Sequence, residues 1–158
     1  MAWSFTLRRR VLFCETDLAG IMHFSNFFRW MEETEHAFYR SMGLSVHPLQ
    51  HGVNDTKVGW PRISAKCDYR APLNFEEEVD VELIVAEMRS KAIRYQFHFR
   101  KLDEARSIAA VGELVVVSVT ADETTRQMRA VSIPETFRSL IQQAPPEAVS
   151  ISNLKPTS

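Results

Sequence analysis

Cysteine, glycine and long apolar runs are all scarce in this sequence. Only Cys14 and Cys67 occur among its 158 residues, which excludes a disulfide framework and a four-thiolate zinc site. Five glycines leave little room for a phosphate-binding loop or a dinucleotide fingerprint, and neither motif occurs. No Gly-x-Ser-x-Gly elbow is present. No apolar run approaches the roughly 20 residues that cross a bilayer, so we expect no membrane partner.

Neither positive nor negative charge is in clear excess. The chain has 19 Lys and Arg against 20 Asp and Glu, and this balance argues against a nucleic-acid partner, which usually requires a basic surplus. It is compatible with a small anionic ligand held by a few local cations. Residues 1–10 are apolar first and basic second, the reverse of a secretory signal. We therefore expect a cytoplasmic protein.

Length and composition predict one globular domain. A chain of 158 residues, 45% apolar and 25% charged, can bury a core without disulfide or metal cross-links. We expect that domain to occupy residues 1–143. Residues 144–158 contain three prolines and no periodicity, which predicts a loose C-terminal tail.

The spacing of apolar residues predicts one long helix among several strands. Apolar residues recur at intervals of three and four from Phe27 to Met42, and Gly43 suits the end of a helix. Apolar and polar residues that alternate with period two predict the strands, and a short connection joins two of them as a hairpin. Pro134 suits the start of a short helix. The expected strands are residues 3–13, 63–69, 79–85, 93–99 and 108–119, and the short helix is residues 135–142. This order predicts an α+β fold.

The common catalytic and metal-binding patterns are not found. His47 and His51 are four residues apart, but Pro48 between them is incompatible with helical ligand geometry, so no metal site is expected. Cys14 precedes Glu15, whose charge would raise the pKa of the thiol rather than activate it. We interpret Cys14 as a structural residue.

Asp17 is the candidate with the most chemical interest. It lies in the segment that leads to the long helix, and one interpretation makes its carboxylate a cap for the N–H groups of that helix. It stands eight residues before Ser25, however, which is too far for simple capping. A loop that folds back would instead place Asp17 beside N–H groups able to polarise a carbonyl oxygen. Both interpretations remain open at this point.

Residues 15–27 resemble a motif of the hotdog-fold acyl-CoA thioesterases of the 4-hydroxybenzoyl-CoA thioesterase type. Residues 30–33, 69–73 and 132–134 continue the resemblance, which spans residues 5–142 in the same order. It implies a five-stranded antiparallel sheet wrapped around one long central helix, with a short C-terminal helix. It also implies a homodimer or homotetramer with sites at the subunit interface, and no cofactor.

The resemblance assigns roles to residues before and within the helix. Asp17 would attack the thioester carbonyl or act as general base on water. The Phe24 N–H would hold the carbonyl oxygen, and Gly20 would allow close approach of the loop. His23 and Phe27 would line the site. His23 stands where the family commonly has Trp or Tyr, and Glu35 where members often have Arg.

The substrate implied by the resemblance is a coenzyme A thioester, and its phosphates would need local cations. Arg89 and Lys91 match the basic turn of the family, and Arg129 or Arg126 near the closing strand could add a contact. We therefore expect an acyl-CoA thioesterase, with an aromatic or a fatty acyl group left undecided. The alternatives are a non-catalytic module that binds acyl or aryl groups and a thioesterase acting on acyl-carrier-protein.

Overall fold

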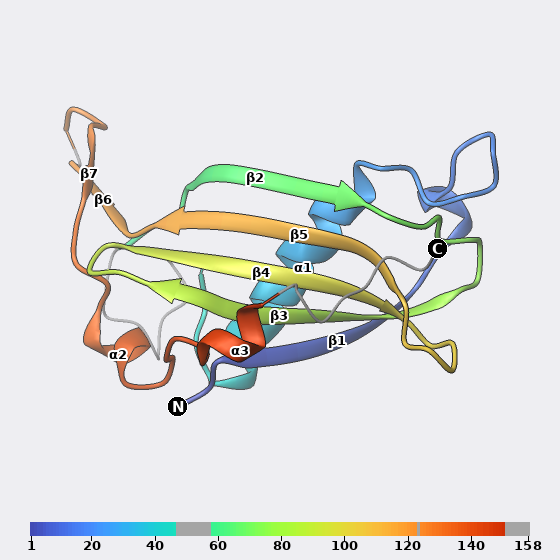
Figure 1. The fold of residues 1–158 in the computed structure, drawn as a ribbon. Coiled ribbons are helices and arrows are strands. Elements are labelled where there is room, and N and C mark those ends of the chain that lie inside the picture. The colour runs from blue at the N-terminus through green and yellow to red at the C-terminus, as the bar shows by residue number, and fades with distance from the viewer. Residues whose placement is uncertain (47–57, 123, 151–158) are drawn as a thin grey trace.

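The structure is a computed structural model, described here for residues 1–46, 58–122 and 124–150. It contains one long helix, five long strands and several short elements (Figure 1). In chain order these are β1 (Ser4–Arg10), a 3-10 turn (Phe13–Glu15), α1 (Asn26–Ser41), β2 (Arg62–Tyr69), β3 (Glu78–Met88), β4 (Ala92–Lys101), β5 (Ile108–Val117), β6 (Val119–Ala121), β7 (Met128–Ala130), α2 (Glu135–Arg138) and α3 (Pro146–Val149).

The five long strands form one antiparallel sheet in the order β1-β3-β4-β5-β2. Figure 1 shows α1 running behind this sheet, with α3 on the opposite face. Strand β2 pairs only with β5 and so forms one edge of the sheet. This is the hotdog arrangement, and it confirms the expected α+β fold. Within the described residues, no helix is both long enough and apolar enough to cross a membrane.

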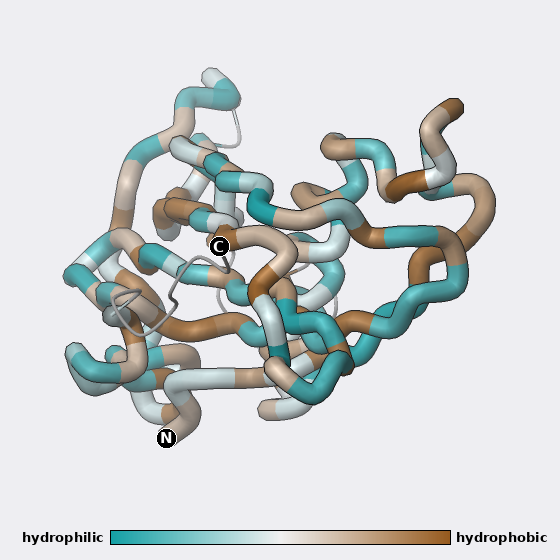
Figure 2. Tube along the Cα trace, turned by 45° about the vertical axis from the view of Figure 1, so that its right-hand side comes forward, coloured by the Kyte–Doolittle hydropathy of each residue, from teal (hydrophilic) through white to brown (hydrophobic). Residues whose placement is uncertain are grey.

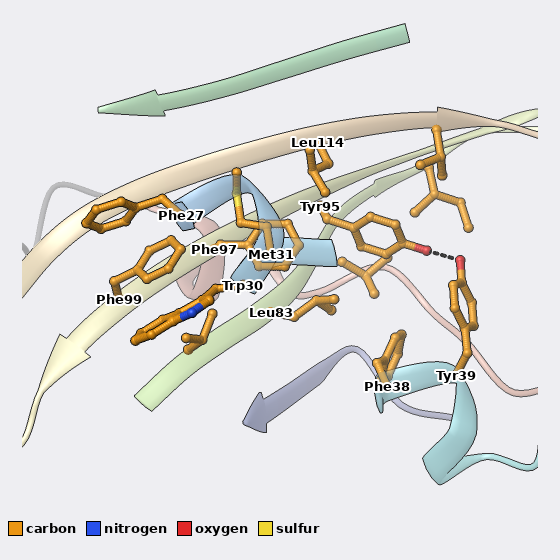
Figure 3. Close-up of a cluster of buried hydrophobic side chains, with 14 of the residues drawn as sticks. Phe27, Trp30, Met31, Phe38, Tyr39, Leu83, Tyr95, Phe97, Phe99 and Leu114 are labelled. Atoms are coloured by element: carbon orange, nitrogen blue, oxygen red, sulfur yellow. Dashed lines mark hydrogen bonds between the residues drawn. The ribbon is translucent and has the colours of Figure 1, made fainter. Parts of the chain in front are cut away.

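The core lies between α1 and the inner face of the sheet (Figure 3). Side chains of α1 that point to the sheet are at most 2% exposed, because apolar residues recur once per helical turn. They are Phe27, Trp30, Met31, Phe38 and Tyr39. They pack on Leu83, Tyr95, Phe97, Phe99 and Leu114 of the strands. Figure 2 shows hydrophobic and hydrophilic segments interspersed along the chain trace.

One glycine of the sheet lets α1 lie close. A Cβ atom on Gly112 would lie 2.2 Å from Met31 Sδ, well inside van der Waals contact. Met31 is fully buried, so the position opposite it on β5 accommodates no side chain. The Met31 side chain therefore fills the space that a Cβ atom on this residue of β5 would occupy.

The main elements agree with the prediction, and several smaller features differ. The long helix and the β3–β4 hairpin are confirmed. The β6–β7 hairpin was not predicted, because three-residue strands are too short to show a period. The short helix α2 ends at Arg138 rather than at residue 142.

The chain does not become loose at residue 144. Ala144 is 3% exposed, and its N–H donates to the Val85 carbonyl at 2.8 Å. Helix α3 follows directly, so the tail prediction is wrong for residues 144–150. The rest of the predicted tail, residues 151–158, lies outside the described residues.

Candidate active site

The segment between β1 and α1, residues 12–25, folds back on itself as a compact loop. The Asp17 N–H donates to the Ile21 carbonyl at 2.9 Å, and the Gly20 N–H donates to the Asp17 carbonyl at 3.0 Å. Gly20 has a φ of 76°, a conformation that glycine adopts at little cost. The turn places Asp17 at the tip of the loop and brings His23 and Phe24 to its base, beside the start of α1.

The Glu15 carboxylate anchors this loop to the helix. It accepts a hydrogen bond from Trp30 Nε1 at 2.7 Å and another from the Leu12 N–H at 2.9 Å. Arg9 Nη2 lies 3.2 Å from the same carboxylate, and its guanidinium lies 5.1 Å from the centre of the Trp30 ring. The buried Trp30 side chain and the half-buried Arg9 side chain thus hold the Glu15 carboxylate, which was not among the predicted site residues.

The backbone of Glu15 forms a second anchor. Its carbonyl accepts the His23 N–H and the Asn26 side-chain amide, both at 2.8 Å. The two strands of the loop and the first residue of α1 therefore meet at one carbonyl oxygen. Glu15 and Asn26 both belong to the motif that carries the family resemblance, and this was the only signal in the sequence for their role.

Asp17 does not cap α1. Its Oδ1 atom accepts the Ala19 N–H at 2.8 Å, a contact within the loop turn. The N-cap of α1 is Ser25. The Asp17 side chain is exposed, and its Oδ2 atom has no hydrogen-bond partner among the described residues. One carboxylate oxygen is therefore fixed in orientation while the other faces solvent.

The Phe24 N–H is directed away from the helix. The His23 carbonyl accepts the Asn26 N–H at 3.0 Å, and the N–H of a trans peptide points opposite to its carbonyl. The Ser25 N–H donates to His23 Nδ1 at 3.3 Å, and the Phe27 N–H lies 3.4 Å from the Phe24 carbonyl. Within the part of the chain that the structure describes, the Phe24 N–H has no acceptor. It is a free donor beside the positive end of α1.

Contacts with Ser25 favour one tautomer of His23. Its Nδ1 accepts the Ser25 N–H and lies 2.8 Å from Ser25 Oγ. Because a backbone N–H can only donate, this contact favours the neutral tautomer in which Nδ1 is the acceptor and the proton lies on Nε2. The imidazole stacks beside the Phe24 ring at 4.4 Å between centres. In this tautomer His23 presents an N–H at the base of the loop.

Phe27 lies beneath the loop rather than at its surface. The side chain is 2% exposed and packs between the rings of Tyr69 and Phe99, each with centres 5.0 Å away. Phe24, in contrast, is 60% exposed, and its carbonyl accepts a hydrogen bond from the Tyr69 hydroxyl at 3.1 Å. In this chain Phe27 supports the site from below while Phe24 faces solvent.

The basic residues predicted to bind coenzyme A lie on adjoining segments at the other end of the sheet. Arg89 and Lys91 form the β3–β4 turn, and the Ser118 N–H beside β6 donates to the Lys91 carbonyl at 2.8 Å. The neighbouring β6–β7 hairpin carries Arg126 and Arg129. The Asp17 loop follows β1, whose last residue pairs with the first residue of β3. The eleven residues of β3 therefore separate the two groups by about 35 Å, so one chain does not bring them together.

A buried carboxylate lies farther along α1. Glu35 is 1% exposed, and Arg62 Nη2 of β2 lies 2.6 Å from its Oε2 atom. Burial raises the pKa of Glu35 from 4.5 to about 7, against the opposing effect of Arg62. The Tyr39 and Tyr95 hydroxyls share a hydrogen bond in the core (Figure 3). The contact between Glu35 and Arg62 joins α1 to the edge strand β2.

The remaining candidate groups do not form a second reactive centre. Burial raises the pKa of the Cys67 thiol to about 12, so this cysteine is not a thiolate at neutral pH. No group of three or more His, Cys, Asp or Glu side chains in the described ranges is arranged to hold a metal ion. Two surface hollows, of about 480 and 230 Å³, are lined entirely by residues outside the 12–25 loop.

Comparison with known proteins agrees with this arrangement. A family model described as the Thioesterase-like superfamily matches residues 11–141. The 1,4-dihydroxy-2-naphthoyl-CoA hydrolase of Prochlorococcus marinus (strain MIT 9313) is 29% identical over 118 residues, covering 72% of this chain and 78% of that protein. The 4-hydroxybenzoyl-CoA thioesterase of Pseudomonas sp. (strain CBS-3) is 24% identical over 140 residues, covering 89% of this chain and 99% of that protein.

Solved structures share the fold. A gentisyl-coenzyme A thioesterase superposes with a TM-score of 0.69 at 29% identity, covering 85% of this chain and 97% of that chain. The family match includes the Asp17 loop, α1 and all strands from β2 to β7. Together with the hotdog arrangement of helix and sheet, it shows that this chain belongs to the thioesterase-like superfamily.

Proposed function

We propose that this thioester hydrolase acts on coenzyme A thioesters of aromatic acids, with Asp17 as its catalytic carboxylate. The observation that carries the proposal is the 12–25 loop, which presents an open carboxylate oxygen and the free Phe24 N–H in one short segment. The relatives described above are named for aromatic acyl-CoA substrates. An aromatic acyl group is therefore favoured over a fatty chain.

In the proposed reaction the Phe24 N–H binds the thioester carbonyl oxygen. Negative charge develops on that oxygen as the carbonyl carbon becomes tetrahedral, and a donor at the start of α1 stabilises it. Asp17 either attacks the carbonyl carbon, giving a mixed anhydride that water hydrolyses, or removes a proton from the attacking water. Both routes release the free acid and coenzyme A. In this proposal His23 Nε2–H donates to the departing thiolate.

The separation of Asp17 from the basic turn supports a dimeric site. Strand β2 is a free edge, and two copies related by a two-fold axis can pair there in antiparallel orientation. The Tyr69 end of β2 in one copy then lies beside the Arg62 end of the other. That Arg62 end adjoins the Arg89 and Lys91 turn, because Pro61 and Lys91 accept hydrogen bonds from the consecutive residues Val117 and Ser118.

Such a homodimer would bring the basic end of one copy toward the Asp17 loop of the other. Arg89, Lys91 and Arg129 would then hold the phosphates of a coenzyme A whose thioester lies at the other copy's loop. The near-zero net charge of the chain fits this arrangement, since the cations are needed only at one end. Two such dimers could assemble further into a homotetramer.

Replacing Asp17 tests the reaction directly. Asp17→Asn removes the charge while keeping the size of the side chain and its Oδ1 acceptor. We expect kcat/KM for benzoyl-type CoA thioesters to fall about 10³-fold, measured with a thiol reagent that detects free coenzyme A. Asp103→Asn, an exposed carboxylate in the β4–β5 turn, is the matched control and should leave activity unchanged.

The panel of substrates separates the alternatives. Aromatic, short-chain and long-chain acyl-CoAs, and the same acyl groups on acyl-carrier-protein, should rank with the aromatic coenzyme A esters first. Undiminished hydrolysis by Asp17→Asn would refute the assigned mechanism. Binding of every ester by the wild-type chain without hydrolysis would identify a non-catalytic acyl-binding module instead.

A further inference from the structure

We propose that Tyr69 is a positioning residue for the oxyanion donor, acting through a hydrogen bond from its hydroxyl to the Phe24 carbonyl. The inference rests on the proposed function, because it concerns the N–H that would bind the thioester oxygen. Tyr69 lies 45 residues from Phe24 in the sequence and ends the edge strand β2. Its hydroxyl contacts the backbone of the loop, and the proposal assigns it no contact with the substrate.

The hydroxyl provides the shorter of the two hydrogen bonds on this carbonyl. Tyr69 Oη lies 3.1 Å from the Phe24 oxygen, whereas the Phe27 N–H that would begin the helical pattern lies 3.4 Å away. A nitrogen-to-oxygen distance of 3.4 Å is beyond the usual range of about 2.7–3.2 Å. The start of the helix alone therefore holds the Phe24 carbonyl weakly.

The first turn of α1 has no side-chain cap that could fix the same peptide. Ser25 occupies the N-cap position, but its side chain makes no capping hydrogen bond to the helix. Its hydroxyl faces His23 instead. The orientation of the turn thus depends on contacts from outside the helix, which are the Glu15 carbonyl on one side and the Tyr69 hydroxyl on the other.

Two hydrogen bonds, from the Asn26 N–H and from the Tyr69 hydroxyl, hold the peptide planes on either side of Phe24. The plane that contains the Phe24 N–H includes the His23 carbonyl, which is fixed by the Asn26 N–H. The next plane contains the Phe24 carbonyl, which Tyr69 holds. The direction of the N–H changes with the torsion angles between the planes, so fixing both planes fixes the donor.

Tyr69 is 46% exposed, and neighbours contact both its ring and the backbone that follows it. Its ring meets the buried Phe27 ring edge to face, with an interplanar angle of 75°. The two N–H groups that follow it, of Arg70 and Ala71, both donate to the Ala109 carbonyl, at 2.8 and 3.0 Å. The pKa of the Tyr69 hydroxyl is raised to about 12, first by burial and then by Cys67. The hydroxyl is therefore a neutral donor throughout the neutral range.

Tyr69→Phe removes this hydroxyl and keeps the ring on Phe27. The carbonyl oxygen of the substrate gains charge only in the transition state, so a misdirected donor lowers kcat more than it changes KM. We expect kcat for an aromatic acyl-CoA to fall about 10-fold, with KM within about twofold of wild type. The pH profile of kcat should be unchanged, because Asp17 and His23 are intact.

Tyr95→Phe is the matched control. It also removes a hydroxyl that shares a hydrogen bond with a second residue, but in the core and away from the loop. Its melting temperature should fall because the Tyr39 hydroxyl loses its partner, while its kcat at 25 °C stays at the wild-type value. Tyr69→Phe should show the opposite pattern, with lower kcat and an unchanged melting temperature.

Hydrogen exchange provides a readout that does not depend on activity. In Tyr69→Phe the amides of residues 25–27 should exchange faster than in wild type, and in Tyr95→Phe they should not. Unchanged exchange at these amides would overturn the positioning role. If Asp17→Asn abolishes activity and Tyr69→Phe leaves kcat unchanged, the positioning role of Tyr69 is likewise overturned. An Asp17→Asn variant that stays active would refute the proposed mechanism, and the exchange result would still decide the role of Tyr69.

Discussion

Glu35 should make the stability of this fold fall as the pH rises from 4.5 to about 7. Its carboxyl is 1% exposed inside the protein, and burial raises its pKa from 4.5 to about 7. The folded state therefore binds the Glu35 proton more tightly than the unfolded state does. Below pH 4.5 both states are protonated and this stabilisation is fully present, and it is lost as the pH rises to about 7.

The size of the effect follows from the difference between the two pKa values. Each pH unit between them changes the free energy of unfolding by about 1.4 kcal/mol. The contribution of Glu35 should thus decline by about 3 kcal/mol between pH 4.5 and pH 7.5. Above that range the ionised carboxylate remains in the core, held by Arg62 at 2.6 Å.

Glu35→Gln removes the titration and keeps the shape of the side chain. Urea unfolding of wild type and variant, at several pH values and one protein concentration, gives the difference in unfolding free energy. That difference should move by about 3 kcal/mol in favour of the variant as the pH rises. Glu32→Gln is the control, because Glu32 contacts the same Arg62 guanidinium at 3.2 Å but is exposed. Parallel pH curves for wild type and Glu35→Gln would refute the reasoning.

Two further predictions concern packing and assembly. Gly112→Ala would place a Cβ atom 2.2 Å from Met31 Sδ. It should therefore lower the free energy of unfolding by about 2 kcal/mol. An unchanged melting temperature would contradict the tight packing of α1 on β5. Light scattering should give the wild-type chain at least twice its monomer mass of 18.2 kDa. Ile63→Lys adds a charge at a 66% exposed position of the β2 edge. This variant should have the mass of the monomer and a lower activity. An active wild-type monomer would contradict the dimeric site.

The elements predicted correctly are those whose signal is local. The period of the apolar residues in α1 records which side of the helix packs on the sheet, so its limits could be read within one or two residues. The β3–β4 hairpin was found for the same reason, because two alternating segments adjoin a short connection. The three-residue strands β6 and β7 carry less than two periods and were missed.

The features of the site that were missed depend on contacts distant in sequence. The bond from Tyr69 to Phe24 exists because β2 pairs with β5 in one register, which no pattern near residue 69 records. The anchoring role of Glu15 depends on the side of α1 that Trp30 occupies. The family motif located Asp17 and Phe24 in one loop, and their catalytic roles stay predictions.

The position of the basic turn at the far end of β3 has a consequence for defective chains. If each site takes its carboxylate from one copy and its cations from the other, a chain that lacks Asp17 and a chain that lacks Arg89 and Lys91 are each inactive alone. Mixed dimers of the two contain one site with both defects and one with neither. Co-expression of two inactive alleles would then restore part of the activity, as complementation between two mutations in a single gene.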